Sequence, residues 1–182
     1  VTRFMQTDIH SIEKTLAGLQ EKELADTVRA VVDARHIYVI GSRSAFGLAY
    51  YFGHSLSWVR GGVRPLDGSQ SIAFDELATS GPEDVAIAIS LPPYPANTVN
   101  LLRIAAENGV KTIAVTDAQA SPLAQIADWA LMVNSEPISL VDNAAPVISL
   151  LTALLELVSG HDPDRTAAHL ERLSRFWDKS GV

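Results

Sequence analysis

The chain has 182 residues, 47% of them hydrophobic, which is enough for one globular domain with its own core. It contains no cysteine, which excludes disulfides, thiolate nucleophiles and zinc–thiolate sites and is consistent with a cytoplasmic location. Its net charge of −7 and isoelectric point near 5.1 exclude it, taken alone, as a DNA-binding module, because such binding depends on lysine and arginine neutralising phosphates.

Residues 4–34 are predicted to form one helix or two. Gly18 and the polar run 20–23 indicate a break between two helices. We expect residues 1–34 to be a helical connector and residues 35–182 to form an α/β domain. Apolar residues three and four apart place a helical stripe before the break: Ile9, Ile12, Leu16 and Leu19.

Beyond residue 34, short apolar runs alternate with helical patterns. The runs that suit buried strands are 36–40, 63–66, 84–90, 111–116 and 129–133. The helical patterns cover about 44–60, 70–79, 96–108, 122–127, 143–159 and 163–178. Asp142 and Asp162 are the expected N-caps of the last two helices.

Strands that are apolar throughout and separated by helices indicate a parallel sheet buried on both faces. Right-handed crossovers leave few topologies for such a sheet. We therefore predict a five-stranded parallel sheet in a three-layer α/β/α sandwich, with flavodoxin-like strand order 2-1-3-4-5. This order places a switch point, where ligands commonly bind, between the first and third strands.

The first of these strands is followed by Gly41, Ser42, Arg43 and Ser44. The segment lacks the second glycine of the dinucleotide-binding fingerprint, because Arg43 occupies that position, and no phosphate-loop lysine follows. Ser42 and Ser44 either cap the next helix or bind a ligand through hydroxyl and N–H groups. Arg43 either pairs with an anionic ligand or points to solvent.

The third strand ends at Ser90, and a stiff loop follows it. Three prolines in the segment 92–95 hold Tyr94 in place, so its ring either forms a pocket wall or packs as part of a rigid turn. Asn97 or Thr98 begins the next helix and offers N–H and side-chain donors. We predict that Ser90, Tyr94, Asn97 and Thr98 contact a small ligand together with the residues of the first loop.

The sequence offers no clear catalytic or metal-binding set. Glu76, Glu136 and Glu156 are possible general bases, but none has a paired acid nearby in the sequence. His54 is more simply a structural residue, and the five histidines lack metal-ligand spacing. We expect no catalytic residue, no metal and no cofactor.

Taken in order, these segments resemble the SIS (sugar isomerase) domain over residues 25–160. The resemblance is greatest to the C-terminal effector domain of RpiR/MurR-type bacterial transcriptional regulators. It depends on four segments: Gly41 to Ser44, Ser90 to Thr98, Ile113 to Asp117, and Ser121-Pro122-Leu123-Ala124 leading to Ala127-Asp128.

The resemblance implies a domain that senses a carbohydrate-derived effector, commonly a sugar phosphate, and forms a dimer or tetramer. It implies DNA binding only through a helix-turn-helix domain absent from this chain, and no membrane partner. In the usual loop, Ser-x-Ser-Gly-x-(Thr/Ser), the middle Ser-Gly is replaced here by Pro-Pro-Tyr in the segment 92–94. Because proline lacks an N–H group, phosphate binding is weakened, and a sugar acid or polyol is an alternative effector.

Two other functions remain open at this point. An aldose–ketose isomerase needs a base and usually an acid, for which Glu76 and His54 are the candidates. A structural dimerisation module is favoured by the nearly all-apolar helix 143–159, which is typical of a core or an interface, and by the apolar residues of the last helix. We predict a homodimer at least.

Overall fold

The computed structural model describes residues 1–136 and 142–181. Five parallel strands form one sheet in the order β2-β1-β3-β4-β5, which confirms the predicted topology. β1 lies between β2 and β3, since Ile37 pairs with both Val63 and Val85. The strands are β1 (Ile37–Gly41), β2 (Val63–Asp67), β3 (Val85–Ile89), β4 (Lys111–Thr116) and β5 (Trp129–Met132).

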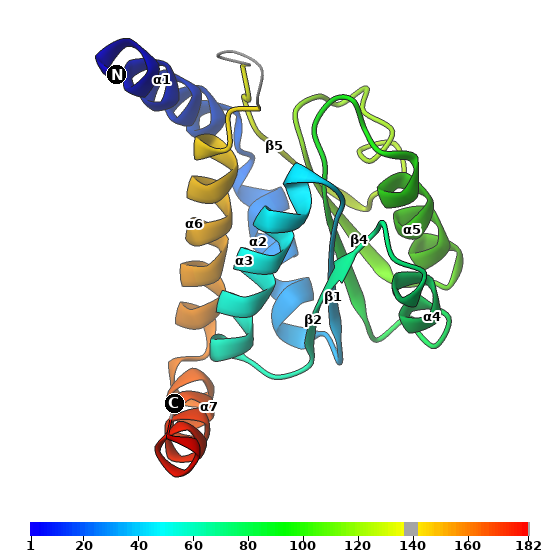
Figure 1. Ribbon diagram of the computed structural model, residues 1–182, viewed down its shortest axis with the longest axis vertical. Coiled ribbons are helices and arrows are strands. Elements are labelled where there is room, and N and C mark those ends of the chain that lie inside the picture. The colour runs from blue at the N-terminus through cyan, green and yellow to red at the C-terminus, as the bar shows by residue number, and fades with distance from the viewer. Residues whose placement is uncertain (137–141, 182) are drawn as a thin grey trace.

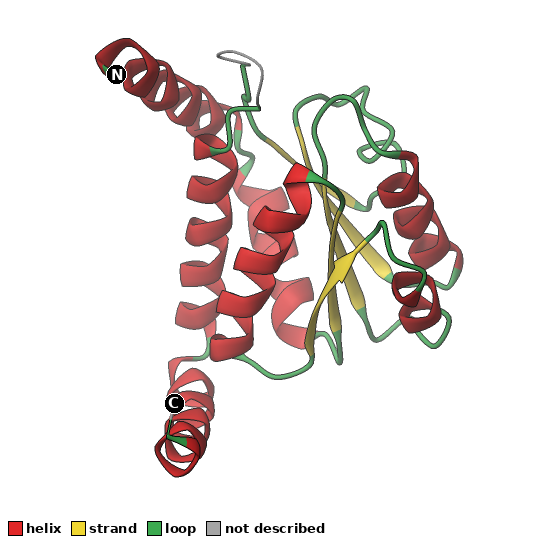
Figure 2. Cartoon of the chain, viewed as in Figure 1, coloured by secondary structure: helices red, strands yellow, loops and turns green. Residues whose placement is uncertain are grey.

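Helices cover both faces of the sheet and complete the three-layer sandwich (Figures 1 and 2). One face carries α2 (Glu21–Asp33), α3 (Ser44–Val59) and α6 (Ala145–His161), and the other carries α4 (Ile72–Leu77) and α5 (Ala96–Glu107). α1 (Thr2–Gly18) and α7 (Pro163–Ser180) extend from opposite ends of the helical layer. None of the helices described is long and apolar enough to cross a membrane.

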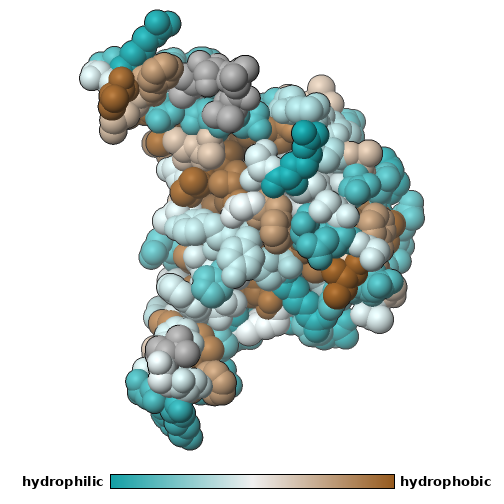
Figure 3. Space-filling model, in the orientation of Figure 1, coloured by the Kyte–Doolittle hydropathy of each residue, from teal (hydrophilic) through white to brown (hydrophobic). Residues whose placement is uncertain are grey.

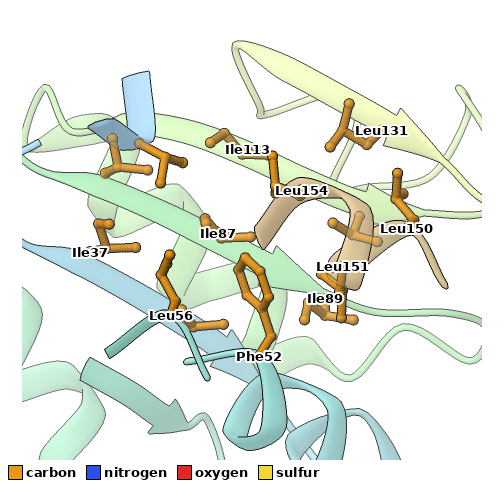
Figure 4. Close-up of a cluster of buried hydrophobic side chains, with 14 of the residues drawn as sticks. Ile37, Phe52, Leu56, Ile87, Ile89, Ile113, Leu131, Leu150, Leu151 and Leu154 are labelled. Carbon is orange, nitrogen blue, oxygen red and sulfur yellow. The ribbon is translucent and has the colours of Figure 1, made fainter. Parts of the chain in front are cut away.

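The core has two parts, one on each side of the sheet. Ile37 and Ile87 point toward the layer of α2, α3 and α6, where Phe52 and Leu151 meet them (Figure 4). The opposite part lies between the sheet and the helices α4 and α5. Each fully buried side chain of this size contributes about 1.5–3 kcal/mol. The inner strands β1 and β3 are buried at every position, whereas the edge strand β2 buries only Leu66.

α2 is part of this sandwich, because Val28 and Val31 are buried in the same core cluster as β1 and α3. Arg60, after α3, lies at the carboxyl end of α2 and donates to the main-chain carbonyls of Val31, Val32 and Ala34. A boundary between connector and domain at residue 34 stays a prediction, since packing alone does not show which residues fold independently.

Two local expectations were wrong. Residues 122–126 form successive turns rather than a helix, because bonds to the third and fourth preceding residues are mixed over a short segment that leads into β5. Asp142 does not cap α6, which begins two residues later than expected, and Asn143 Oδ1 accepts from Ala145 N instead. The predicted cap Asp162 is present on α7, where its carboxylate accepts from Arg165 N at 3.0 Å.

Candidate functional site

A cavity of about 320 Å³ opens at the carboxyl ends of β1 and β3, beside the amino ends of α3 and α6. β1 and β3 are neighbours in the sheet, and the chain leaves them toward opposite faces: β1 leads to α3 and β3 to α5. The cavity is therefore at the predicted switch point. The polar residues that line it are Ser42, Arg43, Ser44, Ser90 and Asp142.

The loop after β1, the loop after β2 and the start of α5 are in close contact beneath this cavity. The hydroxyls of Ser42 and Thr98 are buried and 2.8 Å apart, which joins the loop after β1 to the start of α5. Gly68 N donates to Gly41 O at 2.9 Å, and a Cβ at Gly68 would lie 2.5 Å from Ser42 Oγ. A Cβ at Gly41 would lie 2.6 Å from the carbonyl oxygen of Ala45. Glycine is needed at Gly68 so that its loop can approach Ser42, and at Gly41 so that the chain can turn directly into α3.

Arg43 joins β1 to α3 with φ 56° and ψ −128°, and it is the sole non-glycine residue with positive φ among those described. Such a conformation costs about 1–3 kcal/mol and is commonly found at functional sites. It places an exposed arginine at the N-cap of α3, beside exposed Ser44. Because no side chain caps α3, its first N–H groups and positive dipole end remain available to an anion.

Ser90 has an unusual environment. Its side chain is fully buried, and its hydroxyl has no hydrogen-bond partner in the described part of the chain. Its N–H donates to Val115 O at 3.1 Å, which fixes the residue at the end of β3. A buried hydroxyl without a partner costs about 1–3 kcal/mol, and a ligand in the cavity can remove this cost by bonding to it.

The loop after Ser90 lines the cavity with its prolines and not with the predicted tyrosine. Pro92, Pro93 and Pro95 line the cavity, but Tyr94 does not. The Tyr94 hydroxyl donates to Asp117 Oδ1 at 2.7 Å, and its ring packs on the core beside α5. Burial and the neighbouring Asp117 raise the pKa of Tyr94 to about 12.

Four of the predicted contact residues therefore line the cavity: Ser42, Arg43, Ser44 and Ser90. Thr98 lies one layer behind, where it orients Ser42. Gly41 supports the turn below the cavity, and Asn97 is exposed outside the lining. The roles of all eight residues in binding stay predictions.

Asp142 is the lining residue that sequence reasoning assigned to another role, since it was expected to cap α6. It reaches the cavity because α6 starts beyond it and packs beside α3. Leu48 and Ala144 add apolar surface to the same wall. The cavity thus offers hydroxyls, one guanidinium and one carboxylate, a set that suits a polyhydroxylated ligand with an anionic group.

The structure separates the candidates for acid–base catalysis. Glu76 lies on α4 and pairs with Arg64, whereas His54 lies on the exposed side of α3 with its ring stacked on Tyr50 at 5.8 Å. α3 and α4 cover opposite faces of the sheet. No group of three or more histidine, aspartate or glutamate side chains that could hold a metal ion occurs within residues 1–136 and 142–181.

Comparison with known proteins agrees with this architecture. The family model described as "SIS domain" matches residues 30–158. An HTH-type transcriptional regulator of Haemophilus influenzae is 29% identical over 133 residues, which are 72% of this chain and 46% of that protein. A glutamine–fructose-6-phosphate aminotransferase (isomerizing) of Pyrobaculum aerophilum is 28% identical over 142 residues, which are 74% of this chain and 23% of that protein. The chain thus spans less than half the length of either relative.

Solved structures show the same fold. The sugar isomerase domain of an RpiR transcription factor from Sphaerobacter thermophilus is 30% identical, with a TM-score of 0.89 over 96% of this chain and 97% of that chain. The Vibrio vulnificus NanR protein, complexed with ManNAc-6P, is 17% identical, with a TM-score of 0.83 over 96% of this chain and 67% of that chain.

Proposed function

Since this chain belongs to the SIS domain family, we propose that it is the effector-sensing and oligomerisation domain of a cytoplasmic transcriptional regulator. The effector is a carbohydrate derivative, and it binds in the cavity at the ends of β1 and β3. The observation that carries this proposal is the Ser90 hydroxyl, which is buried at the cavity wall without a protein partner among the described residues.

The lining determines how such an effector would be held. The free N–H groups at the start of α3 and the Arg43 guanidinium suit a phosphate or carboxylate. Ser90 and Asp142 suit sugar hydroxyls. Pro92 and Pro93 offer no N–H donors on the other wall, so a phosphate would depend mainly on the α3 side. NanR, which has the same fold, is complexed with ManNAc-6P, and this supports a sugar phosphate ahead of a sugar acid or polyol.

Regulation of transcription is supported by the relatives. The chain is 30% identical to a domain of an RpiR transcription factor and 29% identical to part of an HTH-type regulator. With a net charge of −7, it would act on DNA only through a helix-turn-helix domain outside these residues.

Self-association is supported by exposed apolar surface. α1 carries exposed Phe4, Met5, Ile9 and Leu16, and its apolar surface is visible in Figure 3. Several large apolar side chains exposed on one helix are typical of a protein interface. A second copy of the chain is the proposed partner, which gives a homodimer or a tetramer of two such dimers.

Isomerase activity is the alternative, since one relative is an isomerizing aminotransferase. The arrangement of Glu76 and His54 on opposite faces of the sheet disfavours it. Asp142 is the one carboxylate among the described residues that line the cavity, and no histidine accompanies it there. A sensing role needs neither group, so it is preferred.

A thermal-shift screen against sugar phosphates, sugar acids and polyols tests the proposal. An effector that binds only the folded state adds about 2.7 kcal/mol to the free energy of unfolding at a hundredfold excess over its Kd, and so raises the melting temperature. The shift should be reduced in Ser90→Ala and retained in Ser174→Ala, an exposed serine on α7. The proposal fails if no compound in the panel shifts the transition. Turnover of an aldose or ketose phosphate would instead establish the isomerase.

A further inference from the structure

A second cleft lies between α7 and the segments that precede β1 and β2, at the amino ends of these strands. Figure 1 shows that α7 lies at this end of the molecule, away from the amino end of α3. It is an open groove with a volume of about 710 Å³, within the range of small-molecule sites. Arginines at four positions line it, and no acidic residue does, although the chain has a net charge of −7. These arginines are Arg35, Arg60, Arg165 and Arg172.

Two of the arginines have structural partners. Arg35 bonds to Asp84 through Nη2 at 2.8 Å and Nε at 3.0 Å, and it faces Glu83 at 3.7 Å. Arg60 is 7% exposed and donates only to main-chain carbonyls, so its charge has no paired carboxylate. The carbonyls at the end of α2 and nearby Asp33 offset part of its charge at the floor of the cleft.

The other two arginines have no carboxylate partner among the described residues. Arg165 and Arg172 are seven residues apart on α7, so they share one face of the helix. Neither has a carboxylate within 4.0 Å among residues 1–136 and 142–181. Burial, together with the positive charge of Arg165, lowers the pKa of Arg60 from its usual value. Arg60 and Arg165 therefore repel one another, an effect that Asp33 offsets in part, and an anion beside them would relieve this repulsion.

Contacts along α7 hold the cleft open in a defined shape. A ring nitrogen of His169, Nε2, lies 2.9 Å from Ser57 O, which ties α7 to the end of α3. The rings of Trp58 and Trp177 meet edge to face at 6.1 Å. Arg172 Nη2 lies 3.2 Å from the other ring nitrogen of His169, which positions its guanidinium at the cleft wall.

The remaining lining is apolar. Val59 and Leu173 line the cleft, and Phe176 lies at its edge with 66% of its surface exposed. A ligand that filled the cleft would meet guanidinium groups and a bare aromatic ring together. Guanidinium groups bind phosphates in a bidentate manner, and aromatic rings stack on flat heterocycles.

We propose that this cleft binds a nucleoside di- or triphosphate, with its phosphates on Arg165 and Arg172 and its base against Phe176. The site is separate from the cavity at the ends of β1 and β3, so it does not depend on the effector proposed above. It gives the domain a second ligand, of a different chemical class, at the opposite end of the sheet.

Isothermal titration calorimetry of the whole chain with ADP and with pyrophosphate tests this proposal. We expect ADP to bind more tightly than pyrophosphate, and R165Q and R172Q each to weaken ADP binding at least tenfold. Phe176→Ala should weaken ADP binding without changing the affinity for pyrophosphate. R175Q is the matched control, because Arg175 lies on the same helix outside the cleft and pairs with Glu171 at 3.2 Å.

Circular dichroism melts of each variant separate loss of binding from loss of folding. The proposal is overturned if neither probe binds at millimolar concentration, if both bind with equal affinity, or if R175Q weakens binding as much as R172Q. Binding of an acidic peptide or of duplex DNA in place of ADP would overturn it as well.

Discussion

Ser42 and Thr98 are 56 residues apart in the sequence, yet their hydroxyl oxygens lie 2.8 Å apart in the core. This bond joins the loop after β1 to the first turn of α5, directly beneath the cavity. Ser42 lines the cavity and Thr98 does not. We therefore expect Thr98 to orient Ser42 and not to touch the proposed effector itself.

Thr98→Val keeps the shape of the side chain and removes the bond. Because Ser42 is then left with a buried, unpaired hydroxyl, we expect the free energy of unfolding to fall by about 1–2 kcal/mol. Effector binding should also weaken, since Ser42 loses its fixed orientation. A double-mutant cycle with Ser42→Ala, followed by denaturant melts, measures the coupling. Additive effects of the two changes would contradict a direct bond.

Ser90→Ala should weaken effector binding without lowering the free energy of unfolding. The hydroxyl has no partner within the described residues, so its removal should leave the free energy of unfolding unchanged or raise it by up to about 1 kcal/mol. Effector affinity should fall several-fold, as expected for one lost hydrogen bond. Parallel melts and titrations check both quantities, and a large loss of stability would make Ser90 a structural residue.

Arg43→Gly should raise the free energy of unfolding and weaken the binding of an anionic effector. Glycine adopts φ 56° without strain, so the variant should gain about 1 kcal/mol of unfolding free energy. An effector with a phosphate or carboxylate should bind more weakly, whereas an uncharged polyol should bind about as before. Arg43→Ala is the control, because it loses the guanidinium and keeps the unfavourable φ. Equal stability of the two variants would show that Arg43 is not strained.

The sequence predicted the inner strands of the sheet well because they are buried on both faces. The run 85–89 is buried at every position and apolar throughout, so its placement depends on composition alone. The same reasoning placed Ser42 and Ser90 at one edge, since the carboxyl ends of parallel strands lie together. Positions next to strand ends could thus be predicted without knowledge of side-chain packing.

Features that depend on packing between distant segments could not be predicted in this way. Tyr94 turns to Asp117 instead of the cavity, and only the path of the proline-rich loop determines that choice. Asp142 enters the lining because α6 begins late and lies against α3. Gly68 packs against Ser42 from the loop after β2, which contains no recognisable sequence motif.

Asp84 should make the free energy of unfolding depend on pH in the acidic range. It is fully buried, which raises the pKa of its carboxyl, but hydrogen bonds from Arg35 and from the N–H groups of Gly81 and His36 outweigh burial and hold that pKa at about 2. A pKa below that of the unfolded chain stabilises the fold above about pH 4, and this contribution, about 2 kcal/mol, is lost as the pH falls from about 4 to about 2.

Asp84→Asn should therefore be less stable than the original chain at pH 7, and the difference should shrink between pH 4 and pH 2. Urea melts at pH 7, 4 and 2.5 measure this difference. Asp178→Asn, which removes an exposed carboxylate from α7, is the matched control and should show no such trend. A difference that stays constant across this range would mean that the substitution costs only packing and neutral hydrogen bonds, and that the charge of Asp84 does not stabilise the fold.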